Sequence, residues 1–247
     1  MTNIPKIIHY CWFGRGKLPK LALKCINSWK EFLPNYEIRI WTEDNFDINC
    51  IRYVKEAYDA KRYAFVSDYA RFWILYNYGG VYLDTDVMII KSIDDILERG
   101  SFMGCETYAN NDSPLFVNPG LGMATEPGNP LLKEMLDLYA NLHFINPDGT
   151  HNIKSIVRYT SEALVAKGLK QTTDIQKIAS IWIYPKEYFN PYDYNKNKIL
   201  ITPQTRSIHY FAGSWITKKE RIMKFIEKYL GERPLIFLHN IKQHVLK

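Results

Sequence analysis

The sequence predicts an α/β fold built as one domain, and three observations support this prediction. The first is the opening of the chain, where a strand at 6–11, a helix at 19–32 and an alternating strand at 36–41 form a strand–helix–strand unit. The second is size, because 247 residues, of which 47% are hydrophobic and 23% charged, suffice for one sizeable core. The third is the lack of any repeat, low-complexity segment or interdomain linker, which favours a single domain over 1–247.

Two helices have the clearest patterns. The first is expected to begin at Pro19, because proline suits the first turn of a helix, and to end at Leu33-Pro34. The second is expected over 64–78, where aromatic and aliphatic residues recur at helical spacing until Gly79-Gly80 stops the helix.

Weaker patterns complete the predicted elements. A short strand at 81–83 follows the double glycine, and extended chain resumes at 87–90 after a polar break. Helices are expected at 130–141, 153–167 and 218–229, a late strand at 206–211, and a polar, aromatic loop at 191–197.

The composition of the chain limits which binding partners and which cellular compartment we expect for the protein. The net charge of +6 favours anionic partners such as nucleotides, phosphates or an anionic membrane face. No basic cluster is interleaved with aromatic residues, so we expect no nucleic-acid partner. The four cysteines match no zinc pattern, no disulfide framework is expected in a chain of this length, and Cys11 and Cys105, which lie in apolar runs, are expected to be reduced core thiols. The N-terminus lacks the apolar region of a signal peptide and no apolar run could span a bilayer, which predicts a cytoplasmic protein that can still rest on the inner face of the membrane.

The strongest chemical motif is Asp84-Thr85-Asp86, where a short apolar strand ends. Residues two apart on a strand point to the same side, so both carboxylates converge and suit Mg²⁺ or Mn²⁺. An EF-hand is excluded, because Met88 and Ile89 occupy positions that need an oxygen ligand and a glycine. Two alternatives stay open on the motif alone: a phosphatase with an aspartyl nucleophile, and a solvated strand end without metal.

Three residues outside the motif occupy positions from which they could bind a ligand. Asp68 and Arg71 are three apart on the helix that leads to Asp84, so they share a face and could hold sugar hydroxyls. The alternative is an ordinary surface ion pair. Trp12 follows the first strand, where α/β proteins bind ligands, and the alternative there is a core tryptophan.

Together these segments resemble a known family. The run YAFVSDYARFWILYNYGGVYLDTDV at 63–87, with IPKIIHYCWFG and SWKEFLPNYEIRIW before it, is similar to the DXD-containing glycosyltransferases of family 32, relatives of the clostridial glucosylating toxins. The resemblance implies a GT-A fold, with a mixed central sheet flanked by helices. It also implies a nucleotide-sugar-binding half at 1–105, and an acceptor side with a C-terminal closing segment at 106–247.

The resemblance also implies roles for individual residues. Asp84 and Asp86 would act through the metal, with Asp86 the more direct ligand. Trp12 would stack on the nucleobase of the donor. Asp68 and Arg71 would contact the transferred sugar, and Tyr82 would line the same site.

The C-terminal part supplies a second set of candidates. The run SIHYFAGSW at 207–215 resembles the His-x-x-Gly element that closes the metal site of related retaining transferases. His209 is therefore a candidate third metal ligand, although a satisfied structural histidine is the alternative. Ser214, Trp215 and Lys218 would reach the diphosphate, and Gly213 to Lys218 has the composition of a lid that closes over a charged ligand.

The resulting prediction is a metal-dependent, retaining glycosyltransferase. It would move a hexosyl unit from a nucleotide diphosphate sugar, most simply a UDP-sugar, to a saccharide or lipid-linked saccharide acceptor in surface polysaccharide synthesis. Lys218 would stabilise the departing diphosphate, and Arg71 would act beside the metal. The small residues at 117–124 would let a substrate approach the backbone, or they form a simple turn into a strand. The alternatives are a phosphohydrolase that uses Asp84 as nucleophile and a non-catalytic nucleotide-sugar binding protein.

Overall fold

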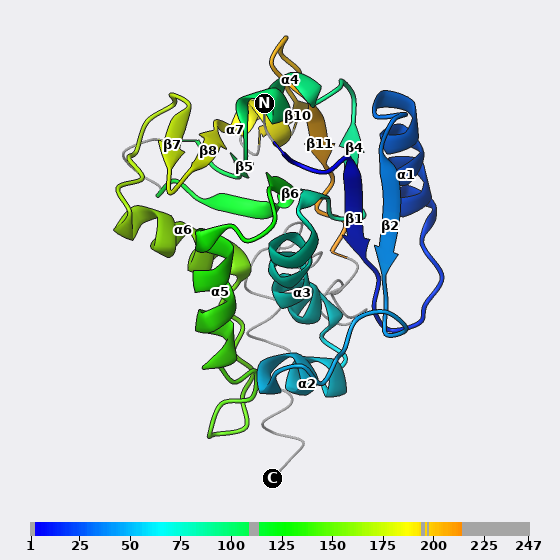
Figure 1. Ribbon diagram of the computed structural model, residues 1–247, viewed down its shortest axis with the longest axis vertical. Helices are drawn as coiled ribbons and strands as arrows, with labels where there is room; N and C mark the ends of the chain where they lie inside the picture. The colour runs from blue at the N-terminus through cyan, green and yellow to red at the C-terminus, as the bar shows by residue number, and fades with distance from the viewer. Residues whose placement is uncertain (1–2, 109–113, 194–195, 197, 214–247) are drawn as a thin grey trace, which may run out of the picture. The chain divides into compact units, whose positions relative to one another are not determined.

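A mixed seven-stranded sheet organises the part of the chain that the structure describes (Figure 1). The structure is a computed structural model that describes residues 3–108, 114–193, 196 and 198–213. Apart from Ala212 and Gly213, these residues belong to one compact unit, Met1–Phe211. The order of the strands across the sheet is β2 (Glu37–Trp41), β1 (Ile7–Cys11), β3 (Gly80–Tyr82), β6 (Val117–Thr125), β5 (Phe102–Cys105), β8 (Ile181–Tyr184) and β7 (Gln176–Ile178).

The direction of the strands decides which side chains meet at one edge. Strand β1 pairs parallel with β2 and β3, and β5 pairs parallel with β8. Strand β6 lies antiparallel between β3 and β5. The carboxyl ends of β1, β3, β5 and β8 therefore share one edge of the sheet with the amino end of β6, and α/β proteins bind their ligands outside such an edge.

Helices cover both faces of the sheet and form two cores. One core includes side chains of α2 (Arg52–Asp59), α3 (Tyr63–Tyr78), α5 (Pro130–Ala140) and α6 (Ile156–Ala166), and the other includes α1 (Lys20–Phe32), α4 (Asp94–Arg99) and α7 (Lys186–Phe189). Along β3, Val81 and Leu83 belong to the second core and Tyr82 to the first, since successive strand residues face opposite sides. In Figure 1, α1 lies beside β1 and β2, while α2, α3 and α5 form a separate group.

A double-glycine turn leads from α3 into β3. Gly79 and Gly80 have φ of 63° and 96°, values that favour glycine. A Cβ on Gly80 would lie 2.7 Å from the carbonyl oxygen of Ile7, so the turn packs directly on β1. The buried His9 ring contacts the Gly79 carbonyl oxygen at 3.0 Å and accepts from Trp41 Nε1 at 3.1 Å. Burial lowers the pKa of His9 to about 4, so at neutral pH the ring is neutral and can make both contacts.

Two further pairs of strands lie outside the main sheet. Strand β4 (Val87–Ile89) pairs antiparallel with β11 (Ser207–His209), so that His209 lies opposite Val87. The indole of Trp29 on α1 donates to the Val87 carbonyl oxygen at 2.8 Å and ties β4 to this helix. Strands β9 (Tyr192–Asp193) and β10 (Lys198–Ile199) form a second antiparallel pair. The first of these pairs is the one that brings a distant residue to the Asp84–Asp86 turn.

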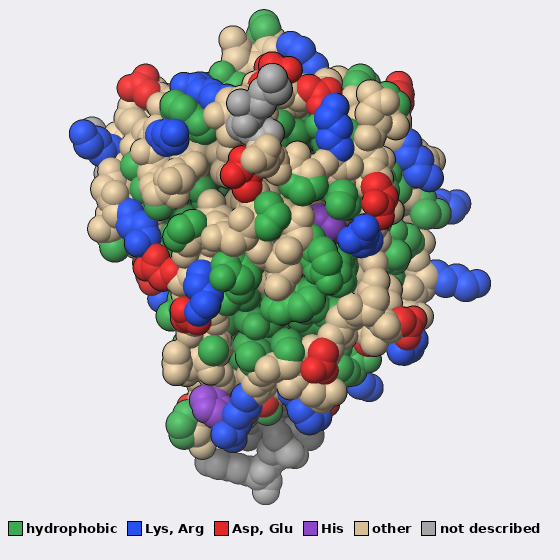
Figure 2. All heavy atoms as spheres, viewed as in Figure 1, with side chains coloured by type: hydrophobic (Ala, Val, Ile, Leu, Met, Phe, Trp, Pro, Cys, Tyr) green, Lys and Arg blue, Asp and Glu red, His purple; other side chains and the backbone are tan. Residues whose placement is uncertain are grey.

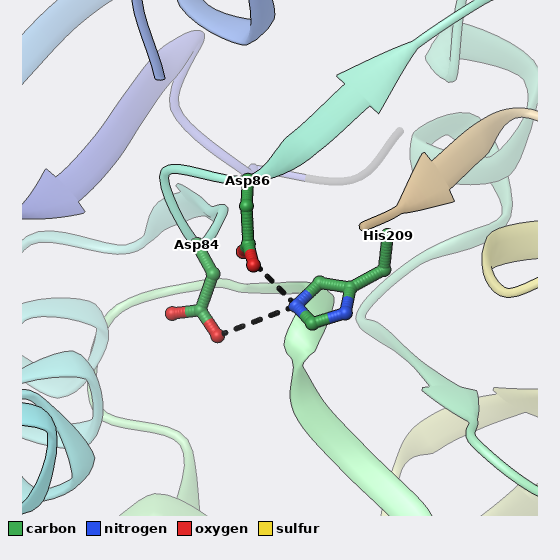
Figure 3. Close-up of side chains that lie close together, drawn as sticks. All are labelled: Asp84, Asp86 and His209. Atoms are coloured by element: carbon green, nitrogen blue, oxygen red, sulfur yellow. Dashed lines mark ion pairs between the residues drawn. The ribbon is translucent and has the colours of Figure 1, made fainter. Parts of the chain in front are cut away.

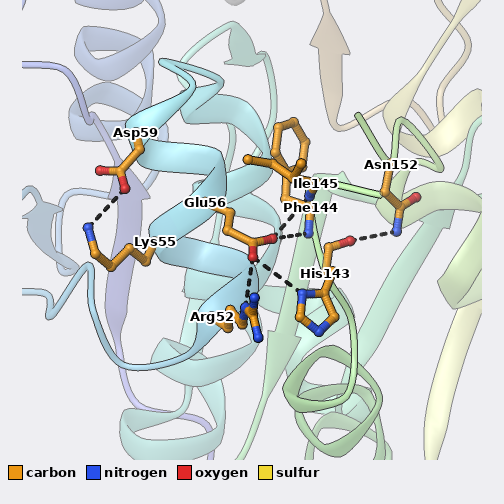
Figure 4. Close-up of polar contacts among 8 residues, drawn as sticks. All are labelled: Arg52, Lys55, Glu56, Asp59, His143, Phe144, Ile145 and Asn152. Carbon is orange, nitrogen blue, oxygen red and sulfur yellow. Dashed lines mark hydrogen bonds and ion pairs between the residues drawn. The ribbon is translucent and has the colours of Figure 1, made fainter. Parts of the chain in front are cut away.

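The carboxylate of Glu56 joins α2 to the segment after α5 (Figure 4). Its Oε2 accepts from the backbone N–H groups of Phe144 and Ile145 at 2.9 and 3.0 Å. Its Oε1 lies 2.9 Å from Arg52 Nε and 3.3 Å from His143 Nδ1. These contacts lower the pKa of Glu56 although burial opposes the shift. Glu56 therefore stabilises this part of the fold as an ionised group.

An aromatic cluster lies at the C-terminal end of α3. Figure 2 shows hydrophobic side chains gathered in the middle of the face where Figure 1 shows α3. Tyr78, which is 40% exposed, lies with its ring centre 5.3 Å from Trp41 and 6.0 Å from Trp73. The cluster packs α3 on β2 and so supports the sheet beside β1.

The structure confirms the predicted strands and helices that lie in its described part, with ends shifted by a few residues. It adds elements that the sequence patterns did not predict: α2, α4, α7, β5, β6, β7 and β8, with the short pair β9, inside the loop predicted at 191–197, and β10, just after it. Strand β6 contains one proline and two glycines, which disfavour strands, yet all nine residues are buried between β3 and β5. The predicted helix at 218–229 lies outside the described residues.

Candidate metal and donor site

The Asp84–Asp86 segment turns sharply where β3 ends. The backbone N–H of Asp84 donates to the Gly120 carbonyl oxygen on β6 at 3.2 Å, and the N–H of Val87 donates back to the Asp84 carbonyl oxygen at 3.0 Å. The Asp86 carbonyl oxygen accepts from the N–H of Tyr210 at 3.0 Å, just beyond β11. The turn is therefore fixed by main-chain bonds to two other strands, and both carboxylates project from a rigid segment.

Three side chains converge at this turn (Figure 3). Nε2 of His209 lies 3.1 Å from Asp86 Oδ1 and 3.9 Å from Asp84 Oδ2. One potential ligand atom from each residue lies within 4.8 Å of the others. Two carboxylate oxygens and one imidazole nitrogen form a donor set that divalent metals accept. Among the described residues, this set is the group of three acidic, histidine or cysteine side chains that could hold a metal ion.

The electrostatics of the three residues fit a cation. Burial disfavours ionised Asp84 and raises its pKa; Arg71 opposes this shift, and the charge of Asp86 adds to it. Burial also opposes a charged His209, but its hydrogen bond to Asp86 and the charges of both aspartates outweigh this effect and raise its pKa. A positive charge between the two aspartates is thus favourable. A divalent ion bound there in place of the histidine proton would carry a larger positive charge.

A buried ion pair on α3 supports Asp84 from the other side. Arg71 Nη2 lies 3.1 Å from Asp68 Oδ1 and 3.3 Å from Asp84 Oδ1. Only 5% of the Arg71 side chain and 11% of the Asp68 side chain are exposed, so this is no ordinary surface ion pair. Burial raises the pKa of Asp68 to about 7; Arg71 opposes the shift and Asp84 adds to it. The pair therefore links the helix to the Asp84–Asp86 turn through one shared guanidinium.

Gly120 on β6 leaves the space that Asp84 occupies. A Cβ at this position would overlap Asp84 Oδ2 and lie 2.9 Å from Arg71 Nη1 and 3.0 Å from Asn118 Oδ1. Any side chain at Gly120 would therefore displace the carboxylate, the guanidinium or the amide. The small residues of this segment thus give room to side chains of the protein, which the sequence alone did not show.

Tyr82 contacts the Asp84 side chain, and Trp12 follows the neighbouring strand β1. Tyr82 is 1% exposed, its hydroxyl donates to Asp84 Oδ1 at 3.2 Å, and the Arg71 guanidinium lies 4.8 Å from its ring centre. Trp12 follows β1, is only partly buried and is absent from the residues that form either core. Its Nε1 donates to the Gly16 carbonyl oxygen at 2.6 Å, which closes the turn after β1.

The remaining sequence candidates, Ser214, Trp215 and Lys218, lie outside the described residues. Two other residues belong to the network around Asp84: Asn118 Oδ1 accepts from the Gly120 N–H at 2.7 Å, and Asn118 Nδ2 donates to Glu106 Oε2 at 2.7 Å. Glu106 escaped the sequence analysis; its position directly after an apolar run, like that of Asp84, is the signal that could have found it.

Residues 19–103 match the family described as glycosyltransferase sugar-binding region containing DXD motif. The match includes Asp68, Arg71, Tyr82, Asp84 and Asp86. The chain is 29% identical over 255 residues to an uncharacterized glycosyltransferase of Acanthamoeba polyphaga mimivirus, with 95% of this chain and 91% of that protein covered.

A second relative is similar over a shorter stretch. The chain is 34% identical over 137 residues to inositol phosphoceramide mannosyltransferase 3 of Schizosaccharomyces pombe, with 54% of this chain covered. It spans only 36% of the length of that protein. Among solved structures, the PaToxG glycosyltransferase superposes with a TM-score of 0.51 at 19% identity over 67% of this chain and 70% of that one. This likeness shows the fold, which is the GT-A type that the sequence predicted.

Proposed function

This chain is a glycosyltransferase with the GT-A fold and a DXD-containing sugar-binding region, and from this premise we propose that it transfers a hexosyl unit from a UDP-sugar with the help of a divalent metal ion. The observation that supports the proposal most directly is the convergence of Asp84, Asp86 and His209 on one point. The last of these residues lies outside the matched family region, yet it meets the DXD motif in space.

The proposed ion is Mn²⁺ or Mg²⁺, held by the two aspartates and His209. We assign Asp86 as the more direct ligand, because Asp84 is also engaged by Arg71 and Tyr82. Bound there, the ion would neutralise the charge that builds on the diphosphate as it leaves. The chain's own residues would prepare the site by holding both carboxylates on the same side of the turn.

Three residues are proposed to bind the donor. Trp12 lies at the carboxyl end of β1, next to β3, and its partly buried ring would stack on the nucleobase. Asp68 and Arg71 would bind hydroxyls of the transferred sugar. Because Arg71 contacts both Asp68 and Asp84, it would also fix the position of the sugar-binding residues relative to the metal.

In the proposed reaction, the oxygen of an acceptor hydroxyl forms a bond to the anomeric carbon while the bond from that carbon to the phosphate oxygen breaks. The bonding electrons leave with the nucleoside diphosphate, and the hydroxyl proton ends on the departing phosphate oxygen. A double displacement would need a carboxylate nucleophile. Asp68 and Asp84 are ion-paired with Arg71, and Asp86 with His209, so we favour attack from the face that the diphosphate leaves, with retention. Ser214, Trp215 and Lys218 are proposed to contact the diphosphate.

The proposed acceptor is a saccharide or a lipid-linked saccharide used in surface polysaccharide synthesis. The name of the yeast relative, a mannosyltransferase of inositol phosphoceramide, supports an acceptor borne on a lipid. Within the described residues, no helix combines the length and the apolar character needed to cross a bilayer. We propose that the protein works in the cytoplasm and meets such an acceptor by peripheral contact with the membrane.

The proposal is tested by a donor screen that needs no acceptor. The protein is incubated with UDP-glucose, UDP-galactose, UDP-N-acetylglucosamine or GDP-mannose, with Mn²⁺ or with excess chelator, and release of the nucleoside diphosphate is measured. We expect slow hydrolysis of one UDP-sugar that requires the metal and is absent in Asp86→Asn. Hydrolysis that is equally fast in chelator would contradict the metal assignment, and a protein that neither binds nor hydrolyses any donor would contradict the proposal.

A further inference from the structure

Polar side chains also follow the next parallel strands along the ligand-binding edge. Glu106 comes directly after β5, and Lys186 follows β8 after Pro185. Strand β6 begins at the same edge, where Asn118 is paired with Gly104 of β5. These residues extend the row that begins with Asp84 after β3, but they lie beyond Gly120, on the side away from Trp12.

Hydrogen bonds join Glu106 to the metal-binding turn. Asn118, which is buried, donates to Glu106 Oε2 at 2.7 Å and accepts from the Gly120 N–H at 2.7 Å. Gly120 in turn accepts from the Asp84 N–H at 3.2 Å. The Asn118 amide therefore lies between the two carboxylates and keeps Glu106 at a fixed place relative to Asp84.

The main chain at Glu106 is held without its carboxylate. Its N–H donates to the Phe116 carbonyl oxygen at 2.7 Å, and its own carbonyl oxygen accepts from Asn190 Nδ2 at 3.0 Å. The Glu106 side chain is thus not needed to anchor the segment, and among the described residues its carboxylate accepts one hydrogen bond, from Asn118. A carboxylate can accept several hydrogen bonds, so Glu106 retains acceptor capacity for a ligand.

No cation neutralises Glu106 by an ion pair within the described part of the chain. Lys186 is buried, and its ammonium donates to the Tyr192 carbonyl oxygen at 2.6 Å and lies 4.9 Å from the Tyr108 ring centre. Burial lowers the pKa of Lys186, and the charge of Glu106 opposes this shift from a distance. Glu106 itself is only partly buried, so it remains reachable by a ligand at the edge of the sheet.

We propose that Glu106, oriented by Asn118, accepts a hydrogen bond from a hydroxyl of the acceptor sugar and so positions the acceptor beside the donor. The inference rests on the proposed function, because it assigns the acceptor side of the same site. A carboxylate accepts hydrogen bonds from hydroxyls and repels anions, so the acceptor moiety bound here is an uncharged sugar. Glu106 takes no part in the proton transfer, which ends on the departing phosphate oxygen.

The test compares donor hydrolysis with transfer in Glu106→Gln. The donor is the UDP-sugar that the wild-type protein hydrolyses, and the acceptor probes are neutral octyl hexosides, with products measured by mass spectrometry. We expect transfer efficiency to fall about ten- to hundredfold, mainly through a higher KM for the acceptor, because a hydrogen bond to a charged group is lost. Donor hydrolysis should stay within about threefold of wild type.

The controls separate this inference from the proposed function. Glu56→Gln changes another partly buried, hydrogen-bonded carboxylate, whose contacts are to α2 and the segment after α5, and should lower thermal stability without changing the ratio of transfer to hydrolysis. Asp86→Asn should lose both activities, and failure of the wild type in the donor screen would count against the proposed function itself. If Glu106→Gln loses hydrolysis and transfer in parallel, or keeps both, Glu106 does not bind the acceptor.

Charge selectivity gives a second readout that a structural role would not change. The wild type should prefer octyl glucoside to octyl glucuronide, which differ by a carboxylate on the sugar. Glu106→Gln should narrow this preference, because removal of the negative charge at residue 106 removes its repulsion of the glucuronide. A preference that is the same in both proteins would overturn the assignment of Glu106.

Discussion

Nε2 of His209 lies 3.1 Å from Oδ1 of Asp86, although the two residues come from segments far apart in the sequence. The antiparallel pairing of β11 with β4 produces this contact, because it places His209 opposite Val87, next to the aspartate. The proposed metal site would be assembled from two paired strands, and its proposed third ligand can be substituted without changing the DXD motif.

His209→Ala should therefore weaken metal-dependent donor binding. We expect the Mn²⁺ concentration for half-maximal donor hydrolysis to rise at least about tenfold, since metal ligands and their close partners typically contribute this much to affinity. His143→Ala is the matched control, because His143 is half-exposed and contacts Glu56. An unchanged Mn²⁺ requirement in His209→Ala would show that the histidine is structural.

Gly120→Ala tests the space that the Asp84 carboxylate occupies. The added methyl group would overlap Asp84 Oδ2 and crowd Arg71, so we expect a loss of donor hydrolysis of about a hundredfold or more with a fold that remains intact. Gly149→Ala adds a methyl group where nothing lies within 4 Å; because Gly149 has φ of 80°, this variant should be less stable, but its activity per folded molecule should stay at the wild-type level. Full activity of Gly120→Ala would mean that Asp84 need not occupy its present place.

Trp12→Ala should weaken donor binding while the protein stays folded. Stacking of a base on an aromatic ring contributes about 1–3 kcal/mol, which corresponds to roughly a five- to 150-fold rise in Kd for UDP. Trp182→Ala is the matched control, because its indole also donates to a backbone carbonyl oxygen, that of Arg99, but lies on β8. A Trp12→Ala protein that unfolds, or that binds UDP as before, would identify Trp12 as a structural residue.

The raised pKa of Asp68 predicts how stability depends on pH. Its pKa is about 7 in the folded protein against an ordinary value of 3.8, so between these values the folded state retains a proton that the unfolded chain has released. The free energy of unfolding should therefore fall as pH rises through this window, by up to about 1.4 kcal/mol per pH unit from this group. Urea unfolding in chelator measures the effect.

Asp68→Asn should flatten this dependence, because asparagine does not titrate. Asp137→Asn, which removes an exposed carboxylate that pairs with Lys133, should leave the slope as it is in the wild type. Equal slopes for the wild type and Asp68→Asn would show that the Asp68 carboxyl is ionised throughout this range. The ion pair with Arg71 would then lower the pKa of Asp68 by more than burial raises it.

The α/β class and the DXD turn could be predicted because each depends on local pattern: a strand–helix–strand opening, a long helix, and carboxylates two apart after a strand. The GT-A fold was predicted from the resemblance to family 32. The sequence did not allow β6 to be predicted, because the burial of that strand between β3 and β5 outweighs its glycines and proline. The division of the chain into a half at 1–105 and a half at 106–247 stays a prediction.

The residues of the site also divide into those that local sequence patterns predict and those whose positions depend on contacts between distant segments. Asp68 and Arg71 were predictable as a pair because helical spacing places them on one face. The position of Glu106 after an apolar run was a local signal, but its contact with Asn118 and the role of Gly120 were not predictable, since both depend on which strand lies beside which in the sheet. The His209 candidate came from a resemblance, and the pairing of β11 with β4 places it at the aspartates.

Calorimetric titration of UDP, with Mn²⁺ or with excess chelator, tests the central claim most directly, because it reports the metal and the diphosphate together and needs neither sugar nor acceptor. The account predicts that the wild type binds UDP with Mn²⁺ and loses most of this affinity in chelator. It also predicts that Asp86→Asn loses the metal-dependent part, with a larger effect than Asp84→Asn, although both proteins fold. Equal UDP affinity in Mn²⁺ and in chelator, or an Asp86→Asn protein that binds as the wild type does, would contradict the assignment of Asp84, Asp86 and His209 as a metal site for the donor diphosphate.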